Sequence, residues 1–225
     1  FLPLLFRRFV ITKRWSRKQI LLRQLSKHLA EDPIIKVTEF DGIFAVDKRS
    51  DLFSRIIIED SYEPKLVNLC LRFLDLNKDV IDIGPNIGLF TVFFAKRIRK
   101  TKVLAVEPTK NALIRLKRNV ELNNVQDIVT IYEGIASDKS GTAKIKIIEG
   151  KEEFSTTGEM LHPSIKNETW TTADIDSNTI DQLVIEHSLH PGLIKIDVEG
   201  AELAVINGAL DVLEQHRPII ISELS

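Results

Sequence analysis

Residues Val80–Phe90, VIDIGPNIGLF, contain the most informative change of pattern in this chain. An apolar run stops at Asp82, passes through Gly84 and Gly88, and becomes apolar again with helical spacing. A strand that turns sharply into a helix is typical of open α/β sheets, whose ligand crevice lies beyond the carboxyl ends of the strands. The two glycines allow a tight turn and a close approach to a ligand, and Asn86 tolerates a positive φ. We therefore expect a small molecule to bind against this turn.

The segments that follow alternate between strand and helix character. Short apolar runs rich in β-branched residues predict strands, and longer runs with helical spacing predict helices. This alternation predicts a mostly parallel sheet covered by helices on both faces. Residues 149–172 are polar and aperiodic, so we expect a long loop there. The expected strands are 79–84, 102–108, 128–136, 141–148, 193–200 and 218–224, and the expected helices are 88–98, 110–123, 179–189 and 201–216.

The N-terminal part has a different pattern. Residues 14–30 predict a basic amphipathic helix, and residues 34–48 alternate around Asp41-Gly42, which is a hairpin signal. A further helix is expected over residues 62–74. The chain is therefore expected to consist of a helical and hairpin extension, residues 1–60, and an α/β domain, residues 61–225.

The composition is that of an ordinary soluble globular protein, with 44% hydrophobic and 28% charged residues among 225. The charge is unevenly spread, although the net charge is −1. Residues 1–30 carry eight of the 31 basic residues and no acid, which leaves 23 basic against 32 acidic residues elsewhere. An acidic body disfavours a phosphate backbone, so we expect no nucleic-acid partner. The basic segment favours peripheral contact with an anionic membrane or an acidic partner. The alternative is a helix that packs on the domain with its charges solvated.

The single cysteine, Cys70, excludes an internal disulfide and lies in an apolar helical run that indicates a core thiol. A reducing compartment, and thus a cytoplasmic location, is expected. No apolar run reaches the roughly 18 residues that would span a membrane. The chain begins at Phe1 rather than Met, which fits a piece of a longer protein. The oligomeric state is left open.

Two ligand classes use a glycine turn between a strand and a helix. A dinucleotide site requires G-x-G-x-x-G, and the spacing of Gly84 and Gly88 does not meet it. Asp82 would repel a pyrophosphate but suits a cationic ligand, and S-adenosylmethionine carries both an ammonium and a sulfonium. Glu107 ends the second strand, 19 residues after Gly88, where a carboxylate can accept hydrogen bonds from ribose hydroxyls. The two acids favour S-adenosylmethionine.

A second acidic motif, LIKIDVEGAE, ends the strand expected over residues 193–200. Asp197 should point into the same crevice, with Glu199 and Glu202 just beyond it. The helix dipole by itself accounts for Glu202 at a helix start. Lys195 alternates onto the same side of the strand as Asp197. We expect it to be a salt-bridge partner rather than a catalyst.

These motifs together resemble the FkbM-type family of S-adenosylmethionine-dependent methyltransferases. The resemblance extends from about Tyr62 to Glu223, and its parts are specific in combination. Pro85 stands where the family usually has alanine, and proline removes one N–H from the turn. The resembling segments are DVIDIGPNIGLFTVFFAK, VLAVEPTKNALIRLKRNVELNN, TIDQL and LIKIDVEGAELAVINGALDVLEQHRPIIISE.

The resemblance implies a class I methyltransferase fold, Rossmann-like and doubly wound, which makes residues 61–225 an S-adenosylmethionine-binding domain. It implies O-methylation of a hydroxyl on a sugar, glycan or other small molecule. Ile135 and Ala136 would pass beside the adenine, and Asp197 would lie beside the methyl group or the acceptor. Such folds usually end with a further pair of strands, so either the domain is truncated after its fifth core strand or the edge of its sheet is covered differently. The cofactor-binding positions implied are Asp82, Gly84, Asn86, Gly88, Glu107, Ile135 and Ala136.

The acceptor hydroxyl must lose a proton during transfer. Asp197 and Glu199 are the catalytic candidates, and His162 is interpreted as an ordinary loop histidine. Asp197 and Glu223 end successive strands and could together hold Mg²⁺ if those strands are neighbours. A third oxygen ligand beside Glu223 is lacking, so a metal site is a minor alternative and none is assigned.

Three other functional interpretations of the chain were compared with this one. A nicotinamide-dependent oxidoreductase conflicts with the glycine spacing and with Asp82. A non-catalytic Rossmann-like binding domain would be indicated by lost cofactor acids, but Asp82 and Glu107 are both present. A nucleic-acid methyltransferase that modifies amino groups would carry an N/D-P-P-Y-type motif, which this chain lacks. The methyl acceptor itself is not identified by any motif.

Overall fold

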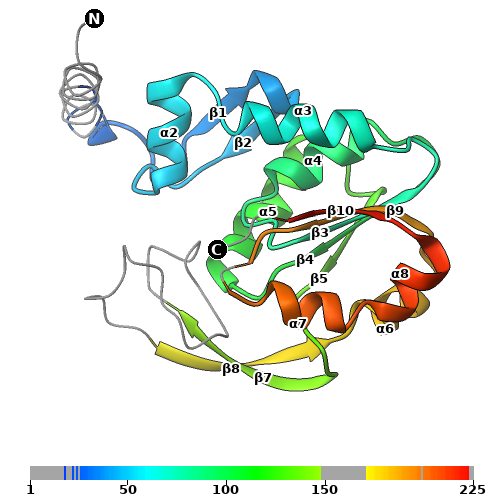
Figure 1. Ribbon diagram of the computed structural model, residues 1–225. Coiled ribbons are helices and arrows are strands. Elements are labelled where there is room, and N and C mark those ends of the chain that lie inside the picture. Colours follow the sequence, from blue (N-terminus) through cyan, green and yellow to red (C-terminus); the bar gives the residue numbers. More distant parts are fainter. Residues whose placement is uncertain are drawn as a thin grey trace, which may run out of the picture.

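A computed structural model describes residues 18, 22, 24, 26–147, 171–198 and 200–222 of the chain. Its centre is a sheet of five strands in the order β10-β9-β3-β4-β5, and every neighbouring pair is parallel (Figure 1). The chain builds outward from β3 through β4 to β5, then returns to add β9 and β10 on the other side of β3. The switch point, where such sheets bind ligands, therefore lies between β3 and β9. The strands are β3 Asp79–Ile83, β4 Val103–Val106, β5 Val129–Tyr132, β9 Pro191–Ile196 and β10 Ile219–Ser222.

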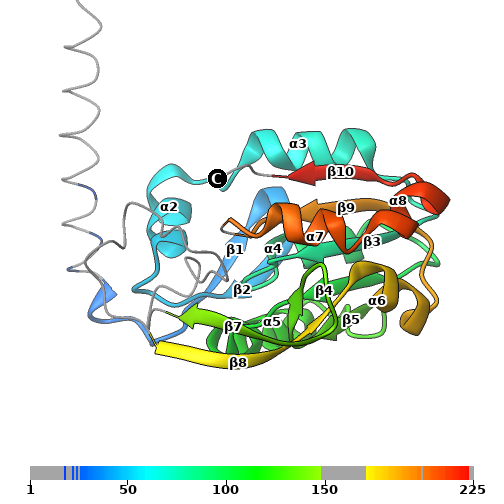
Figure 2. The ribbon, with the colours of Figure 1, turned by 60° about the horizontal axis from the view of Figure 1, so that its bottom comes forward.

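Helices cover both faces of this sheet, which confirms the doubly wound parallel fold (Figure 1). One face carries α3 Pro64–Phe73, α4 Leu89–Ala95 and α5 Lys110–Leu122, and α3 lies over the β10 edge (Figure 2). The other face carries α6 Ile180–His187, α7 Glu202–Asn207 and α8 Leu210–His216. Because successive side chains of a strand point to opposite faces, each strand contributes to two separate cores. Val80 and Leu193 belong to the core beneath α4, whereas Ile81, Ile83 and Ile194 belong to the core beneath α6 and α8.

The predicted N-terminal hairpin is confirmed. Strands β1 Ile34–Val37 and β2 Gly42–Ala45 pair antiparallel through the short helix η1 Thr38–Phe40, and Asp41 adopts a positive φ of 51° in the turn. The hairpin shares its hydrophobic core with the central sheet. Phe40 is fully buried and meets Phe90 of α4 edge-on, with ring centroids 5.0 Å apart.

Helix α2, Asp51–Glu59, was not predicted from the sequence, because its isoleucine run also fits a strand. Ser50 starts the helix by accepting a hydrogen bond from the backbone N–H of Phe53 at 3.1 Å. Most of the basic helix predicted over residues 14–30 lies outside the described residues. Within the part that is described, Lys18 donates to the Ile58 carbonyl at 3.0 Å and Leu22 belongs to the core. No helix among the described residues is long and apolar enough to cross a membrane.

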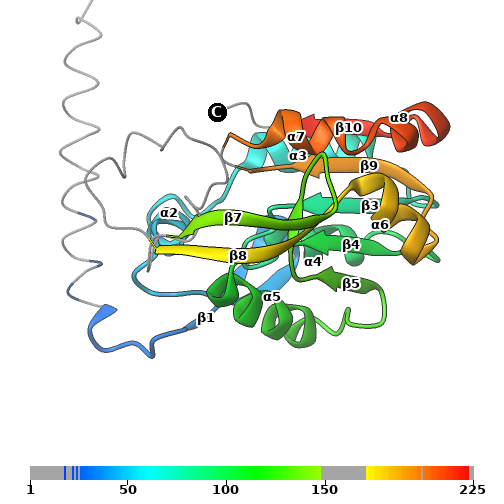
Figure 3. The same ribbon diagram turned by 90° about the horizontal axis from the view of Figure 1, so that it is seen from below.

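The single strand predicted over residues 128–136 is wrong, because β5 ends at Tyr132 and a new strand begins after Gly134. The new strand, β6 Ile135–Ala136, joins a second sheet of order β6-β8-β7, with β7 Gly141–Ile147 and β8 Thr171–Asn178. This sheet lies on the same side of the central sheet as α6 and α7 (Figure 3). Strand β8 was missed because its sequence, TTADIDSN, is mostly polar and gains its strand structure by pairing with β7. Its first two residues fall in the loop predicted over 149–172, most of which lies outside the described residues.

The single helix predicted over residues 201–216 is also wrong, because α7 and α8 are separate helices. The break falls at Gly208, where a Cβ atom would lie 1.9 Å from the carbonyl oxygen of Ser137. The Gly208 carbonyl accepts a hydrogen bond from the Asp181 N–H at 3.0 Å. The Asp181 side chain in turn accepts from the N–H of Val212 at 2.8 Å, in the first turn of α8. These contacts with residues distant in sequence end α7 and start α8.

Candidate functional site

The glycine turn between β3 and α4 has the backbone that its sequence predicts. Gly84, Asn86 and Gly88 have φ values of 71°, 52° and 88°. A Cβ atom at Gly84 would lie 1.9 Å from the carbonyl oxygen of Asp197. Glycine is therefore required at position 84 for two reasons: its φ is positive, and the ends of β3 and β9 are in close contact there. The turn lies at the switch point of the sheet.

Asp82 lies one residue before the end of β3 and is fully buried. Its Oδ2 accepts a hydrogen bond from Thr91 Oγ1 at 2.6 Å, whereas its buried Oδ1 has no hydrogen-bond partner among the described residues. Burial raises the pKa of Asp82, and the nearby positive charge of Lys195 lowers it only in part. An unbonded carboxylate oxygen at the switch point is costly, so it fits a site that receives a cationic group.

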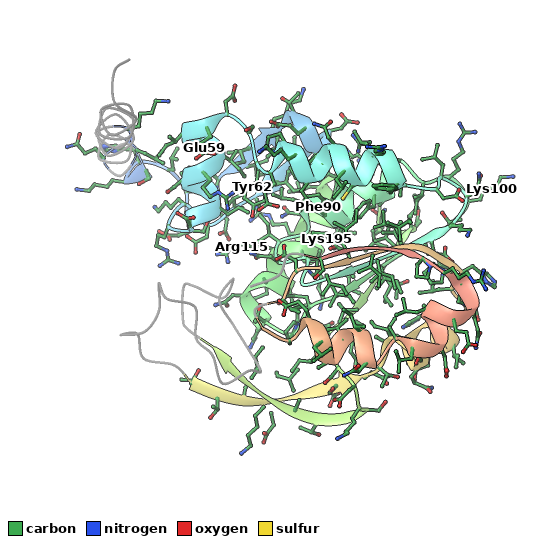
Figure 4. All side chains as sticks on the ribbon, viewed as in Figure 1. Glu59, Tyr62, Phe90, Lys100, Arg115 and Lys195 are labelled. Atoms are coloured by element: carbon green, nitrogen blue, oxygen red, sulfur yellow. The ribbon has the colours of Figure 1, made fainter. Side chains whose placement is uncertain are left out.

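Lys195 supplies the only charge compensation that the described residues give to Asp82 through an ion pair. Its Nζ lies 3.7 Å from Asp82 Oδ1 and 3.0 Å from Asp197 Oδ2, which confirms the predicted salt bridge. The same Nζ lies 4.9 Å from the centroid of the Phe90 ring (Figure 4). Burial by itself would lower the pKa of Lys195, but the two carboxylates outweigh burial and raise it. Lys195 therefore stays protonated and holds two acids together.

Glu107 follows the last residue of β4 and is 5% exposed. Its Oε2 accepts from the backbone N–H of Asn86 at 3.1 Å, so the second predicted acid lies directly against the glycine turn. Its Oε1 accepts from the N–H and the hydroxyl of Thr109 at 2.9 and 2.5 Å. A carboxylate has about four acceptor positions, so the three bonds leave room for about one ribose hydroxyl. Burial raises the pKa of Glu107 to about 7, although these hydrogen bonds oppose the rise.

Asp197 follows β9, and its side chain is 39% exposed, far more than those of Asp82 and Lys195. Its backbone N–H donates to the Ile83 carbonyl at 3.0 Å, which continues the pairing of β9 with β3. Lys195 Nζ donates a hydrogen bond to Asp197 Oδ2, and the rest of the Asp197 side chain is accessible to solvent. Such a carboxylate can meet a second substrate that enters from outside.

The remaining predicted positions differ in their placement. Ile135 and Ala136 are buried in β6, at the carboxyl end of β5 but in the second sheet. Glu199, Glu223 and His162 lie outside the described residues. Strands β9 and β10 are neighbours, as the possible metal pair Asp197 and Glu223 would require. Among the residues that the structure describes, no group of three or more His, Cys, Asp or Glu could hold a metal ion.

The junction between α2 and α3 adds a second layer over this site, which no sequence motif predicted. The guanidinium of Arg55 lies 4.7 Å from the centroid of the Tyr62 ring, and Tyr62 packs on Phe40 with centroids 6.3 Å apart. Burial raises the pKa of Tyr62, and the charges of Glu63 and Asp197 raise it further. Figure 4 shows Tyr62, Phe90 and Lys195 between the N-terminal helices and the sheet. No motif surrounds Tyr62, so only the folded chain reveals its position.

Cys70 is fully buried in α3, as its apolar surroundings predict. Burial raises the pKa of its thiol to about 12. Because the thiolate is the reactive form, this cysteine is a packing residue and not a nucleophile.

Comparison with known proteins finds relatives among methyltransferases. Methyltransferase 1 of Beauveria bassiana (strain ARSEF 2860) is 26% identical over 145 residues, which are 59% of this chain and 58% of that protein. Methyltransferase sdnD of Sordaria araneosa is 26% identical over 199 residues, which are 74% of this chain and 73% of that protein. The chain thus matches little more than half the length of the first relative.

A solved structure, the O-methyltransferase from Bacillus cereus in complex with SAH, aligns with 92% of this chain and 74% of its own. The identity is 13% and the TM-score 0.46, so this likeness adds nothing to the sheet topology described above. The family model of the methyltransferase FkbM domain matches residues 82–225. This match includes the glycine turn, Glu107 and Asp197, and it covers more than half of the 225 residues. The chain therefore belongs to the FkbM methyltransferase domain family.

Proposed function

We propose that this protein transfers a methyl group from S-adenosylmethionine to a hydroxyl oxygen of a sugar, glycan or other small molecule. One observation carries the proposal. Asp82, Glu107 and Asp197 come from three adjacent parallel strands and gather around one glycine turn. The first two acids are buried and the third is half-exposed, which suits an enclosed cofactor beside an open acceptor site.

The residues present fit the cofactor. Within the described part of the chain, Asp82 Oδ1 accepts no hydrogen bond and shares the single charge of Lys195 with Asp197, so the two carboxylates together leave a net negative charge for a cationic group. Glu107 offers its remaining acceptor position to a ribose hydroxyl. Gly84 and Gly88 keep side chains away from the turn, so that the backbone can approach a ligand. S-adenosylmethionine, when bound, supplies the methyl group that is bonded to its sulfonium sulfur and is therefore electrophilic.

The chain's own groups can place the acceptor and take its proton. Asp197 is the group we assign as general base, because it is solvent-accessible and lies at the switch point. Lys195 holds one of its oxygens at 3.0 Å and so fixes the orientation of the carboxylate. Holding the reacting oxygen in line with the methyl group is chiefly a matter of positioning. Removal of the hydroxyl proton completes the requirement for O-methylation.

The test uses cofactor with an isotopically labelled methyl group and a panel of glycans, lipid-linked sugars and small hydroxylated compounds. Mass spectrometry should find one class of acceptor that gains a single labelled methyl group, attached to oxygen. Asp197→Asn should abolish the transfer while leaving cofactor affinity nearly unchanged. Labelling at nitrogen or carbon would overturn the proposed oxygen specificity. Tight cofactor binding without transfer to any member of a broad panel would favour a non-catalytic binding domain.

A further inference from the structure

Two asparagines of α5 stand against the free edge of β2. Asn119 Oδ1 accepts from the N–H of Ala45 at 2.7 Å, and its Nδ2 donates to the carbonyl of the same residue at 3.2 Å. Asn123, which caps α5, makes the same pair of bonds to Ile43 at 3.1 and 2.7 Å. Four residues of a helix rise about 6 Å, and two residues of a strand span about 7 Å. The two side chains therefore match alternate residues of β2 and satisfy an edge that would otherwise lack backbone partners.

The two asparagines differ in one bond. The Nδ2 of Asn119 also donates to the carbonyl of Ile87 at 2.8 Å, inside the glycine turn. The Nδ2 of Asn123 instead donates to the Asn119 carbonyl of its own helix at 2.8 Å. Only the first of the pair thus connects β2 with the turn. Asn119 is fully buried, so water does not compete for these bonds.

The bond to Ile87 holds a peptide plane that could otherwise rotate. Ile87 lies between Asn86 and Gly88, which both have positive φ. The N–H of Gly88, on the far side of the same peptide plane, donates to the Pro85 carbonyl at 2.9 Å. Since glycine accepts φ values of either sign, sterics alone do not fix this plane. It is held at one end by Pro85 and at the other by Asn119.

We propose that Asn119 is a positioning residue for the cofactor turn and that it makes the N-terminal hairpin part of the cofactor site. The proposal rests on the proposed binding of S-adenosylmethionine at this turn. Loss of the bond to Ile87 leaves the 87–88 peptide held only by the Gly88–Pro85 bond, so the turn is less ordered before the cofactor binds and the affinity falls. Ordering of the turn by a bound cofactor should in the same way stabilise the segment of β2 around Ala45.

The first experiment compares Asn119→Ser with its matched control Asn123→Ser. Both variants lose two bonds to β2 and should unfold at a lower temperature in the absence of ligand. Isothermal titration with S-adenosylhomocysteine should show about a tenfold loss of affinity for Asn119→Ser only, the effect of losing one hydrogen bond. An unchanged affinity in Asn119→Ser, or an equal loss in both variants, would overturn the inference. A wild-type protein that binds neither S-adenosylmethionine nor S-adenosylhomocysteine would overturn the proposed function as well.

A second experiment needs no variant and so does not depend on the fold tolerating one. Amide hydrogen exchange of the wild-type protein is measured with and without S-adenosylhomocysteine. The ligand should slow exchange within the glycine turn and also at Ala45, which bonds to Asn119. Exchange at Ile43, which bonds only to Asn123, should change less. Protection confined to the turn, with no change at Ala45, would refute the coupling.

Discussion

Lowering the pH from 8 to 6 should weaken cofactor binding by protonating Glu107. Burial raises the pKa of this carboxyl to about 7, while the hydrogen bonds from Thr109 and Asn86 lower it in part. A ribose hydroxyl donates to the ionised carboxylate, so the proposed site needs the charged form. If only that form binds, the affinity falls about tenfold per unit below a pKa of about 7. The expected loss between pH 8 and pH 6 is therefore about tenfold.

The stability of the unliganded protein should change in the opposite direction. The folded-state pKa of Glu107 lies above its ordinary value of 4.5, so the folded protein binds more protons than the unfolded chain between pH 4.5 and about 7. The protonated Glu107 carboxyl therefore contributes its full stabilisation below pH 4.5, and this stabilisation is lost as the pH rises through about 7. Its size is of the order of 3 kcal/mol.

Isothermal titration with S-adenosylmethionine at half-unit steps of pH measures the affinity. Repeating the titration at pH 6 in buffers of different ionisation enthalpy counts the protons, and about one should be released per cofactor bound. The control is Glu107→Gln, which cannot ionise and should bind more weakly but with the same affinity at pH 6 and pH 8. A flat affinity in the wild-type protein, or an equal pH slope in Glu107→Gln, would refute the reasoning.

Two further substitutions test the packing and the charges of the site. Gly84→Ala places a Cβ atom 1.9 Å from the Asp197 carbonyl oxygen and should cost about 3 kcal/mol or more in urea unfolding. Gly200→Ala, where φ is also positive but a Cβ would meet nothing within 4 Å, should cost only about 1–2 kcal/mol, and equal losses would contradict the close-contact argument. Lys195→Met leaves Asp82 buried without its cation, so the free energy of unfolding should fall by about 3–5 kcal/mol, as for a broken buried ion pair. The loss of unfolding free energy in Lys195→Met should be larger at pH 8 than at pH 5, because a raised pKa of Asp82 makes the stability fall as the pH rises. A loss that is the same at both pH values would show that the charge of Asp82 is not its cause.

The amino-acid sequence alone was enough to predict the order of the central strands and helices and the backbone of the glycine turn. Continuous apolar strands separated by helical runs could form only a parallel sheet covered on both faces, and that sheet is found. The positive φ values of Gly84, Asn86 and Gly88 follow from the conformational freedom of those residue types. The position of Glu107 beside the turn follows from the rule that the carboxyl ends of parallel strands meet at one edge.

Features that depend on residues far apart in the chain became visible only in the folded protein. Strand β8 is polar and exists because β7 pairs with it, and the break between α7 and α8 exists because Ser137 lies against Gly208. In the sequence, Asn119 is an ordinary polar residue of a predicted helix, yet it forms hydrogen bonds with the backbone of Ala45, 74 residues earlier. Local hydrophobic periodicity reports which face of an element is buried. It does not report which distant backbone group a buried polar side chain will meet, and that pairing connects the hairpin to the glycine turn.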